Sequence, residues 1–214
     1  MKGLLYKEFC LLRKNLLFLL GMIVFFSAAF SIGGINTAIL IMWSMLVGMQ
    51  AMNSFSLDEM ANWNQTAMTM PLTRKQIVQE KFLLQGILTG MGALVTGITA
   101  LLFQAIFKTV SVQFLTEVLF LEWVSICSSL LFGSIALALL FRFSSERARL
   151  FSLVLIVIPA CSGSSVFAEG MPEWILMGKS AIAAALGILT VAALILEVVM
   201  YHISYAVFFR KDLA

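Results

Sequence analysis

The chain has 214 residues, of which 61% are hydrophobic and only 12% are charged, and its mean hydropathy is +1.02. Soluble domains carry roughly 45–50% apolar and about 25% charged residues. The 14 basic and 11 acidic side chains are too few to give a core of this size a polar surface. The composition therefore excludes a water-soluble globular domain and indicates a protein whose solvent is the lipid bilayer.

Stretches without charge predict where the chain crosses the membrane, since a spanning helix needs about 20 apolar residues. The first such stretch, 15–57, would be about 65 Å long as one helix, roughly twice the hydrocarbon thickness. It must fold back, and Gly33, Gly34 and Asn36 favour a turn near its middle. Six spans are predicted, at about 15–31, 37–55, 75–104, 118–141, 149–167 and 180–207. The predicted fold is thus all-α and polytopic, with one transmembrane domain over 1–214.

The positions of the basic residues predict the orientation, because Lys and Arg concentrate in cytoplasmic segments. With the N-terminus inside the cell, 12 of the 14 basic residues lie on the cytoplasmic side, and only Lys108 and Lys179 lie outside. Both termini are therefore predicted to be cytoplasmic. Trp123 and Trp174 are predicted as anchors near the outer surface.

Residues 1–14 are too short and too charged to span. Leu5, Phe9 and Leu12 share one helical face, with Lys7 opposite, which is typical of a helix lying in the membrane interface. The alternative is a basic flank that only orients the first span.

The segment between the second and third spans contains two helix-start patterns. Ser56 with Glu59 and Thr73 with Gln76 each pair an N-cap hydroxyl with an acceptor at the third helical position, and Pro71 lies between them. This predicts a short helix at about 57–65, followed by the third span from Arg74.

The predicted short helix carries Asp58, Glu59 and Trp63. Aromatic residues are enriched in the buried centres of protein interfaces, so this segment suits docking to a soluble partner. The alternative is a helix lying on the membrane with Trp63 at the lipid headgroups.

Small residues recur along one face of the third span. They are Gly86, Gly90, Ala93, Gly97 and Ala100. Such a face allows helices to approach closely in lipid, so it is interpreted as a packing face within the chain or across a dimer.

The fifth predicted span contains Pro159, so a straight helix is not expected there. Backbone groups freed by a proline inside the bilayer need partners in protein or in a water-filled cavity. We expect a broken or re-entrant segment at about 160–178, with a kinked helix reaching Phe167 as the alternative.

Glu197 is the one carboxylate well inside a predicted span, and Tyr201 and Ser204 share its helical face. A central acid costs roughly 2.5–3.5 kcal/mol to insert, so it should face protein or a polar cavity. The two interpretations are a polar patch in a transport pathway or subunit interface, and a locally hydrogen-bonded, protonated glutamate without a transport role.

The sequence contains neither the GxxxxGK[ST] phosphate loop nor GxGxxG, HExxH or CxxC. Cys10, Cys127 and Cys161 lack metal-ligand spacing, so no metal site is predicted. No catalytic residue, bound cofactor or nucleic-acid partner is expected for this chain. Energy for any transport would have to come from another protein.

The layout and one local motif together resemble a known family. The motif runs from Pro71 through Leu72, Thr73, Arg74, Lys75, Gln76, Ile77 and Val78 to Lys81 and Phe82. With six spans, cytoplasmic ends and an N-terminal interfacial helix, the chain resembles the membrane subunit of a type-2 ATP-binding-cassette (ABC-2) exporter. It is similar to the bacterial permeases that export phenol-soluble modulins and bacteriocin-like peptides.

The resemblance implies that residues near 57–72 form a coupling helix that fits a groove in a separate ATPase. Its coupling residues would be Asp58, Glu59, Trp63, Pro71 and Arg74. Two ATPase subunits would use ATP and Mg to rock two permease chains, expected to be a homodimer, between inward-open and outward-open forms.

By the same resemblance, spans two and five would line the dimer interface and translocation path, and the segment after Pro159 would correspond to re-entrant outer helices. Pro159, Glu197 and Tyr201 are the candidate residues of the pathway or dimer interface, the last two from the polar patch of the sixth span. The cargo would be an amphipathic peptide or hydrophobic molecule, and the location the bacterial cytoplasmic membrane.

Two other classes of protein are alternatives. An intramembrane serine protease would need a serine and a histidine within hydrogen-bond reach, here Ser134 and His202. A non-energised immunity or sensor subunit of the membrane is the other alternative.

Overall fold

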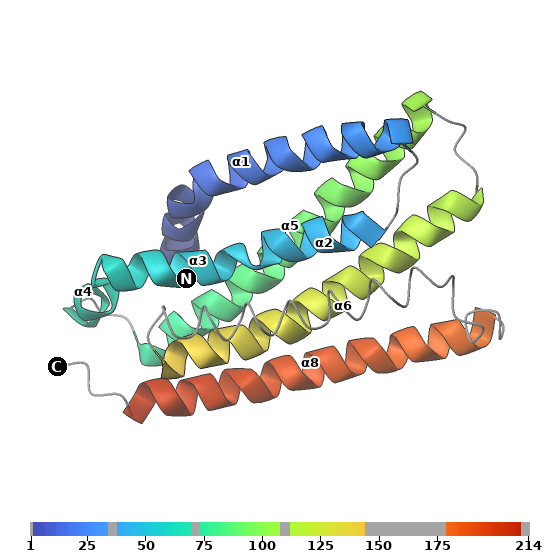
Figure 1. The fold of residues 1–214 in the computed structure, drawn as a ribbon. Helices are drawn as coiled ribbons and strands as arrows, with labels where there is room; N and C mark the ends of the chain where they lie inside the picture. The colour runs from blue at the N-terminus through green and yellow to red at the C-terminus, as the bar shows by residue number, and fades with distance from the viewer. Residues whose placement is uncertain (1, 34–37, 70–72, 108–111, 144–178, 211–214) are drawn as a thin grey trace.

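The computed structural model describes residues 2–33, 38–69, 73–107, 112–143 and 179–210 (Figure 1). Its helices are α1 (Lys2–Gly33), α2 (Ala38–Gly48), α3 (Gln50–Met60), α4 (Trp63–Thr69), α5 (Arg74–Phe107), α6 (Val112–Arg142) and α8 (Lys179–Arg210). All regular structure in these ranges is α-helical, as the sequence predicts. Helices satisfy every backbone group within one segment, which the hydrocarbon core of a membrane requires.

Four of the described helices are long and apolar enough to cross a membrane, over Gly3–Ala28, Arg74–Ile106, Phe114–Arg142 and Leu186–Phe209. They contain the first, third, fourth and sixth predicted spans. The fifth predicted span and the re-entrant segment expected after Pro159 lie outside the described residues. The number of six spans therefore stays a prediction.

The predicted second span at 37–55 is occupied by two helices in line, α2 and α3, with a turn at Met49 between them (Figure 1). The second of these helices, α3, continues to Met60, past the predicted end of the span at about residue 55. The helix start predicted at Ser56 is wrong, because Ser56 lies inside α3 and its Oγ donates to the carbonyl oxygen of Met52 at 3.3 Å. A serine in a helix interior commonly bonds the carbonyl four residues back, and here that bond replaces the cap.

No break separates the predicted interfacial helix at 1–14 from the first span, since α1 is one helix that changes direction near its start (Figure 1). The apolar face expected to lie on lipid contacts protein instead. Leu12 is fully buried among side chains of α3 and α5, and Leu5 and Phe9 pack at the edge of the same cluster. Burial of this face fixes the start of α1 to the bundle.

The centre of the bundle is formed by α2, α5 and α6, with α1 packed on α5 and α8 packed mainly on α6. The start of α1, α4, the start of α5 and the ends of α6 and α8 lie together at the left of Figure 1. Which side of the membrane this end faces stays a prediction.

Hydroxyl groups and small residues line the contacts among α2, α5 and α6. Ser44 Oγ bonds Ser125 Oγ, Thr89 Oγ1 lies 3.0 Å from Ser129 Oγ, and Gln85 Nε2 donates to the Ser129 carbonyl oxygen at 3.1 Å. The hydroxyl groups of these side chains have partners within the bundle, whereas Gln85 Oε1 is buried without one among the described residues. The three helices are therefore joined by polar contacts as well as by packing.

The glycines that close this centre are not the ones expected from the sequence. A Cβ on Gly92 would lie 2.9 Å from the Ser44 carbonyl oxygen, whereas one on Gly86 or Gly90 would meet nothing within 4 Å. A Cβ on Gly97 would make ordinary contact with Glu122 at 3.7 Å. The predicted small face thus does not provide the tightest approach within the chain, and its role across a dimer stays a prediction.

Candidate functional site

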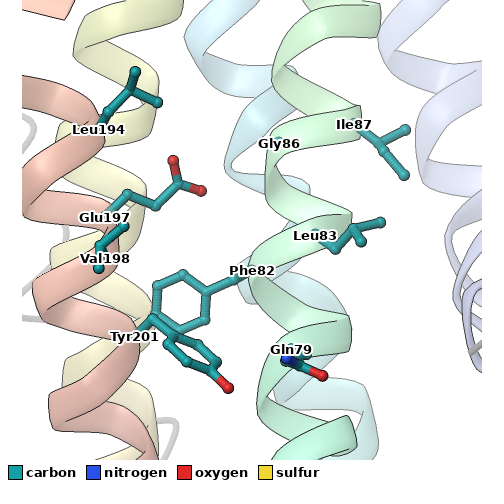
Figure 2. Close-up of a pocket in the computed structure, with 9 residues that line it drawn as sticks. All are labelled: Gln79, Phe82, Leu83, Gly86, Ile87, Leu194, Glu197, Val198 and Tyr201. Atoms are coloured by element: carbon teal, nitrogen blue, oxygen red, sulfur yellow. The ribbon is translucent and has the colours of Figure 1, made fainter. Parts of the chain in front are cut away.

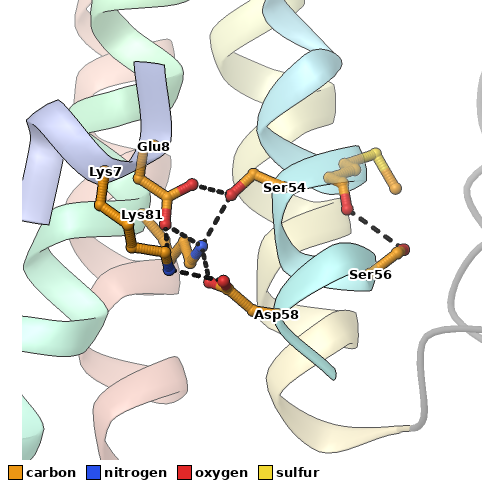
Figure 3. A network of polar contacts seen from close by, with 7 residues as sticks. Lys7, Glu8, Ser54, Ser56, Asp58 and Lys81 are labelled. Carbon is orange, nitrogen blue, oxygen red and sulfur yellow. Dashed lines mark hydrogen bonds and ion pairs between the residues drawn. The ribbon is translucent and has the colours of Figure 1, made fainter. Parts of the chain in front are cut away.

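Five polar side chains from α1, α3 and α5 form a buried ion cluster: Lys7, Glu8, Ser54, Asp58 and Lys81 (Figure 3). Asp58 receives Lys7 Nζ on Oδ1 and Lys81 Nζ on Oδ2, each at 2.5 Å. Glu8 Oε1 lies 2.8 Å from Lys7 Nζ and 2.9 Å from Lys81 Nζ. Ser54 Oγ donates to Glu8 Oε2 and accepts from Lys81 Nζ at 2.8 Å.

Because the ion cluster is buried, its stability depends on each of its charged side chains. The side chains of Glu8, Lys81 and Asp58 are 0%, 3% and 6% exposed, and Lys7 is 26% exposed. Two positive and two negative charges balance, so no net charge remains in a poorly solvated site. Removing one partner from such a group leaves a buried charge uncompensated, which is strongly destabilising.

The ion cluster determines where the predicted docking residues lie. Asp58 is buried in it, so its carboxylate holds α3 to α1 and α5 instead of presenting a charge to a partner. Trp63 is partly buried against the neighbouring hydrophobic core, and Lys7 Nζ lies 4.2 Å from the centre of its ring. Glu59, one residue beyond Asp58, is partly buried.

The segment reverses at a tight turn between α3 and α4. Asn62 has a φ of 50°, and asparagine tolerates this left-handed conformation better than most residues. Met60 is 80% exposed, and Ala61 and Asn62 are exposed as well. The single short helix predicted at 57–65 is therefore two helix ends joined by a protruding tip, residues 60–62.

The second predicted helix start is confirmed. Thr73 N donates to Gln76 Oε1 at 3.0 Å, and Gln76 N donates to Thr73 Oγ1 at 3.3 Å, which is a reciprocal capping box. Arg74 then reaches α8, where it donates to the carbonyl oxygens of Phe208 and Phe209 at 3.5 and 2.8 Å. Arg74 thus satisfies carbonyls at the end of α8, while Pro71 lies outside the described residues.

A groove of about 660 Å³ runs between α5 and α8 (Figure 2). Its lining residues are Gln79, Phe82, Leu83, Gly86, Ile87, Leu194, Glu197, Val198 and Tyr201. Figure 2 shows the Glu197 carboxylate pointing from α8 toward α5 beside Gly86. The groove brings together Glu197, Tyr201 and Gly86, which the sequence singled out for different reasons.

Polar atoms in this groove lack partners. Among the described residues, Glu197 makes no hydrogen bond or ion pair. The Tyr201 hydroxyl is buried without a hydrogen-bond partner in the described part of the chain, although its ring packs edge to face on Phe82 at 5.8 Å. The local hydrogen bonding expected in the alternative interpretation of Glu197 is thus not seen here.

The protease alternative finds no geometric support in the described part of the chain. Ser134 is fully buried and its Oγ donates to the Leu131 carbonyl oxygen at 3.0 Å. His202 is exposed on α8 and contacts the Tyr201 ring, so the serine has no base beside it. Nor do three His, Cys, Asp or Glu side chains gather in this part to hold a metal ion.

Sequence reasoning missed that Lys7, Glu8 and Lys81 belong to one site. The sequence pattern places Lys7 opposite the apolar face of the N-terminal helix and Lys81 near the end of the motif that begins at Pro71, and it joins neither lysine to Asp58. A signal was present, because Lys81 lies seven residues inside α5, too deep for a charge that only flanks a helix. Its acidic partners could not be chosen, since Glu8 and Asp58 are 73 and 23 residues away along the chain.

Together, the apolar helices, the polar centre and the ion cluster at one end define a multi-pass helical membrane protein. The family model for ABC-2 family transporter proteins matches residues 3–210, so the chain belongs to that family. Membership identifies it as a membrane subunit of a transporter that works with an ATPase subunit. No curated protein and no solved structure matches the chain at a significant level.

Proposed function

We propose that this chain is the permease subunit of an ATP-driven exporter in the bacterial cytoplasmic membrane. A separate ATPase binds ATP and Mg and supplies the energy, while this chain forms the path for an amphipathic peptide or hydrophobic cargo. Two ATPase copies act on two permease chains arranged as a homodimer. The absence of a phosphate loop from the sequence is consistent with this division of labour.

The observation that carries the proposal is the ion cluster. Asp58 lies two residues before the exposed tip at 60–62, and its carboxylate is bonded to Lys7 of α1 and Lys81 of α5. A displacement of the tip is therefore resisted by bonds to two helices at once. A rigid connection of this kind can pass a movement of a partner at the tip to membrane-spanning helices.

The exposure of the tip changes which residues we propose to contact the ATPase. Asp58 and Trp63 are engaged within the chain, so their role is to hold the segment in shape. The exposed Met60, with Ala61 and Asn62, is the part that a groove in a partner could receive. Pro71 remains in the proposed coupling segment, and Arg74 fastens the start of α5 to the end of α8.

Reconstitution with its ATPase tests the proposal. The two proteins are purified together and placed in lipid vesicles loaded with a fluorescent amphipathic peptide. We expect ATP-dependent movement of the peptide, lost when the phosphate-loop lysine of the ATPase is replaced. Stable association without ATP-dependent transport of any cargo would instead indicate a non-energised subunit and contradict the proposal.

A further inference from the structure

The groove between α5 and α8 combines an apolar wall with an unpaired acid. Phe82, Leu83, Ile87, Leu194 and Val198 provide the wall. The carboxylate of Glu197 points into the space beside Gly86, where even an added Cβ would meet nothing within 4 Å (Figure 2). An unpaired carboxylate in apolar surroundings is costly to ionise, and a cation placed beside it offsets that cost.

We propose that this groove binds the cargo, and that the cargo carries a cationic amine on an apolar chain; the inference rests on the proposed transport function. The amine donates to the Glu197 carboxylate, and the Tyr201 hydroxyl on the same wall, which has no partner among the described residues, offers a second acceptor. The apolar chain lies along Phe82, Leu194 and Val198.

The depth of the site favours a molecule in transit over a resident lipid. Glu197 is 13 residues from Arg210, the end of α8, which places it about 20 Å along the helix axis. Gly86 is 12 residues from Arg74, the start of α5, at about 18 Å. With a hydrocarbon core about 30 Å thick, both positions lie within the core, whereas the amine of a phospholipid stays at the surface with the phosphate to which it is joined.

Photolabelling of the full chain in phosphatidylcholine vesicles tests this inference without the ATPase. The probes are hexadecylamine and hexadecanol, each carrying the same diazirine in its chain, and labelled peptides are identified by mass spectrometry. We expect the amine to label α5 and α8 at the groove at least about tenfold more than the alcohol, because one hydrogen bond to a charged group accounts for such a factor.

Three variants in the groove and one control outside it decide the interpretation. Glu197→Gln should lower amine labelling to the level of the alcohol, and Glu197→Asp should retain most of it. Gly86→Leu, which fills the space but keeps the charge, should also abolish the preference for the amine. Glu122→Gln makes the same chemical change at a buried acid on α6 that does not line the groove, and should leave labelling unchanged.

Equal labelling by the two probes, or an undiminished preference in Glu197→Gln, would overturn the inference. So would efficient disulfide cross-linking between two copies of Leu83→Cys in a background with the native cysteines replaced, because a second chain would then occupy the groove. Since the ATPase takes no part, these outcomes are separate from the transport assay, which tests the proposed function.

Discussion

The two sides of α5 differ in how the ionisable side chains that lie there are paired. Toward α1 and α3, Lys81 is held by two carboxylates and a hydroxyl in the ion cluster. Toward α8, Gly86 faces Glu197, whose carboxylate has no partner among the described residues. The two positions on α5 are five residues apart, or about 7.5 Å along the helix.

This difference indicates that the ion cluster holds helices together, whereas the groove can bind a ligand. A cluster in which each charge has a partner fixes the helices that contribute to it, and removing one of the partners costs stability. An acid without a partner fixes nothing, and it leaves bonding capacity for a ligand. The ion cluster should therefore control stability and coupling, and the α5–α8 groove should control the choice of cargo.

Loss of an ion-cluster charge should have the largest effect. Lys81→Met leaves Glu8 and Asp58 with only Lys7, and breaking a buried pair costs about 3–5 kcal/mol. The melting temperature in detergent should fall by roughly 10 °C. Lys75→Met, at an exposed position on the same helix, is the matched control and should melt as the wild type does. Equal melting temperatures for the two variants would show that the cluster does not hold the bundle.

The centre of the bundle can be tested with two glycines on the same helix. Gly92→Ala places a Cβ 2.9 Å from the Ser44 backbone, and overpacking of this kind costs about 1–3 kcal/mol. Gly90→Ala has open space and should be neutral or slightly stabilising, because alanine favours a helix by up to about 1 kcal/mol over glycine. Thermal unfolding of both variants checks this, and the reverse order of stability would refute the proposed packing.

A smaller loss is expected at the contact between the start of α5 and the end of α8. Arg74→Ala removes the hydrogen bonds to the carbonyl oxygens of Phe208 and Phe209 and the contact with the Phe209 ring. Because the site is partly exposed, the cost should be about 1 kcal/mol. Hydrogen exchange should show faster opening at the end of α8, with α1 unchanged; unaltered exchange there would argue against this contact.

We expect the smallest effect on stability from a substitution in the groove. Glu197→Gln removes a charge that makes no bond, so the melting temperature should change by less than about 2 °C, the shift expected for 0.5 kcal/mol. A large loss of stability in this variant would mean that Glu197 has a structural partner. The contrast with Lys81→Met would then disappear.

Apolar stretches predict the long helices, because α5 and α6 contain the charge-free stretches 82–107 and 123–141, and α8 contains a stretch interrupted only by Glu197. Each of the three helices ends at or next to a basic residue. The sequence also predicts the capping box at Thr73, since both of its hydrogen bonds join residues three apart. Patterns of this kind depend on local chemistry, and they do not require knowledge of which helices are neighbours.

Features that depend on which helices pack together cannot be predicted from these sequence patterns. Ser56 with Glu59 has the same spacing as the true capping box, but α3 continues to Met60, and Asp58 of this last turn is buried in the ion cluster. Gly92 is two residues from Gly90, about 200° around the helix, and only the position of α2 shows which face is crowded. For the same reason, Asp58 could be recognised as important but not as a partner of Lys7 and Lys81.

Cross-linking at the tip tests the central claim most directly. In a chain whose native cysteines are replaced by serine, Met60→Cys is placed in vesicles together with the ATPase, labelled with a short maleimide–diazirine reagent and illuminated, so that the diazirine inserts into any protein in contact with the tip. The account predicts a covalent complex with the ATPase, and modification of this cysteine by a membrane-impermeant reagent only from the cytoplasmic side. Modification from the outside alone, with no complex formed, would contradict it.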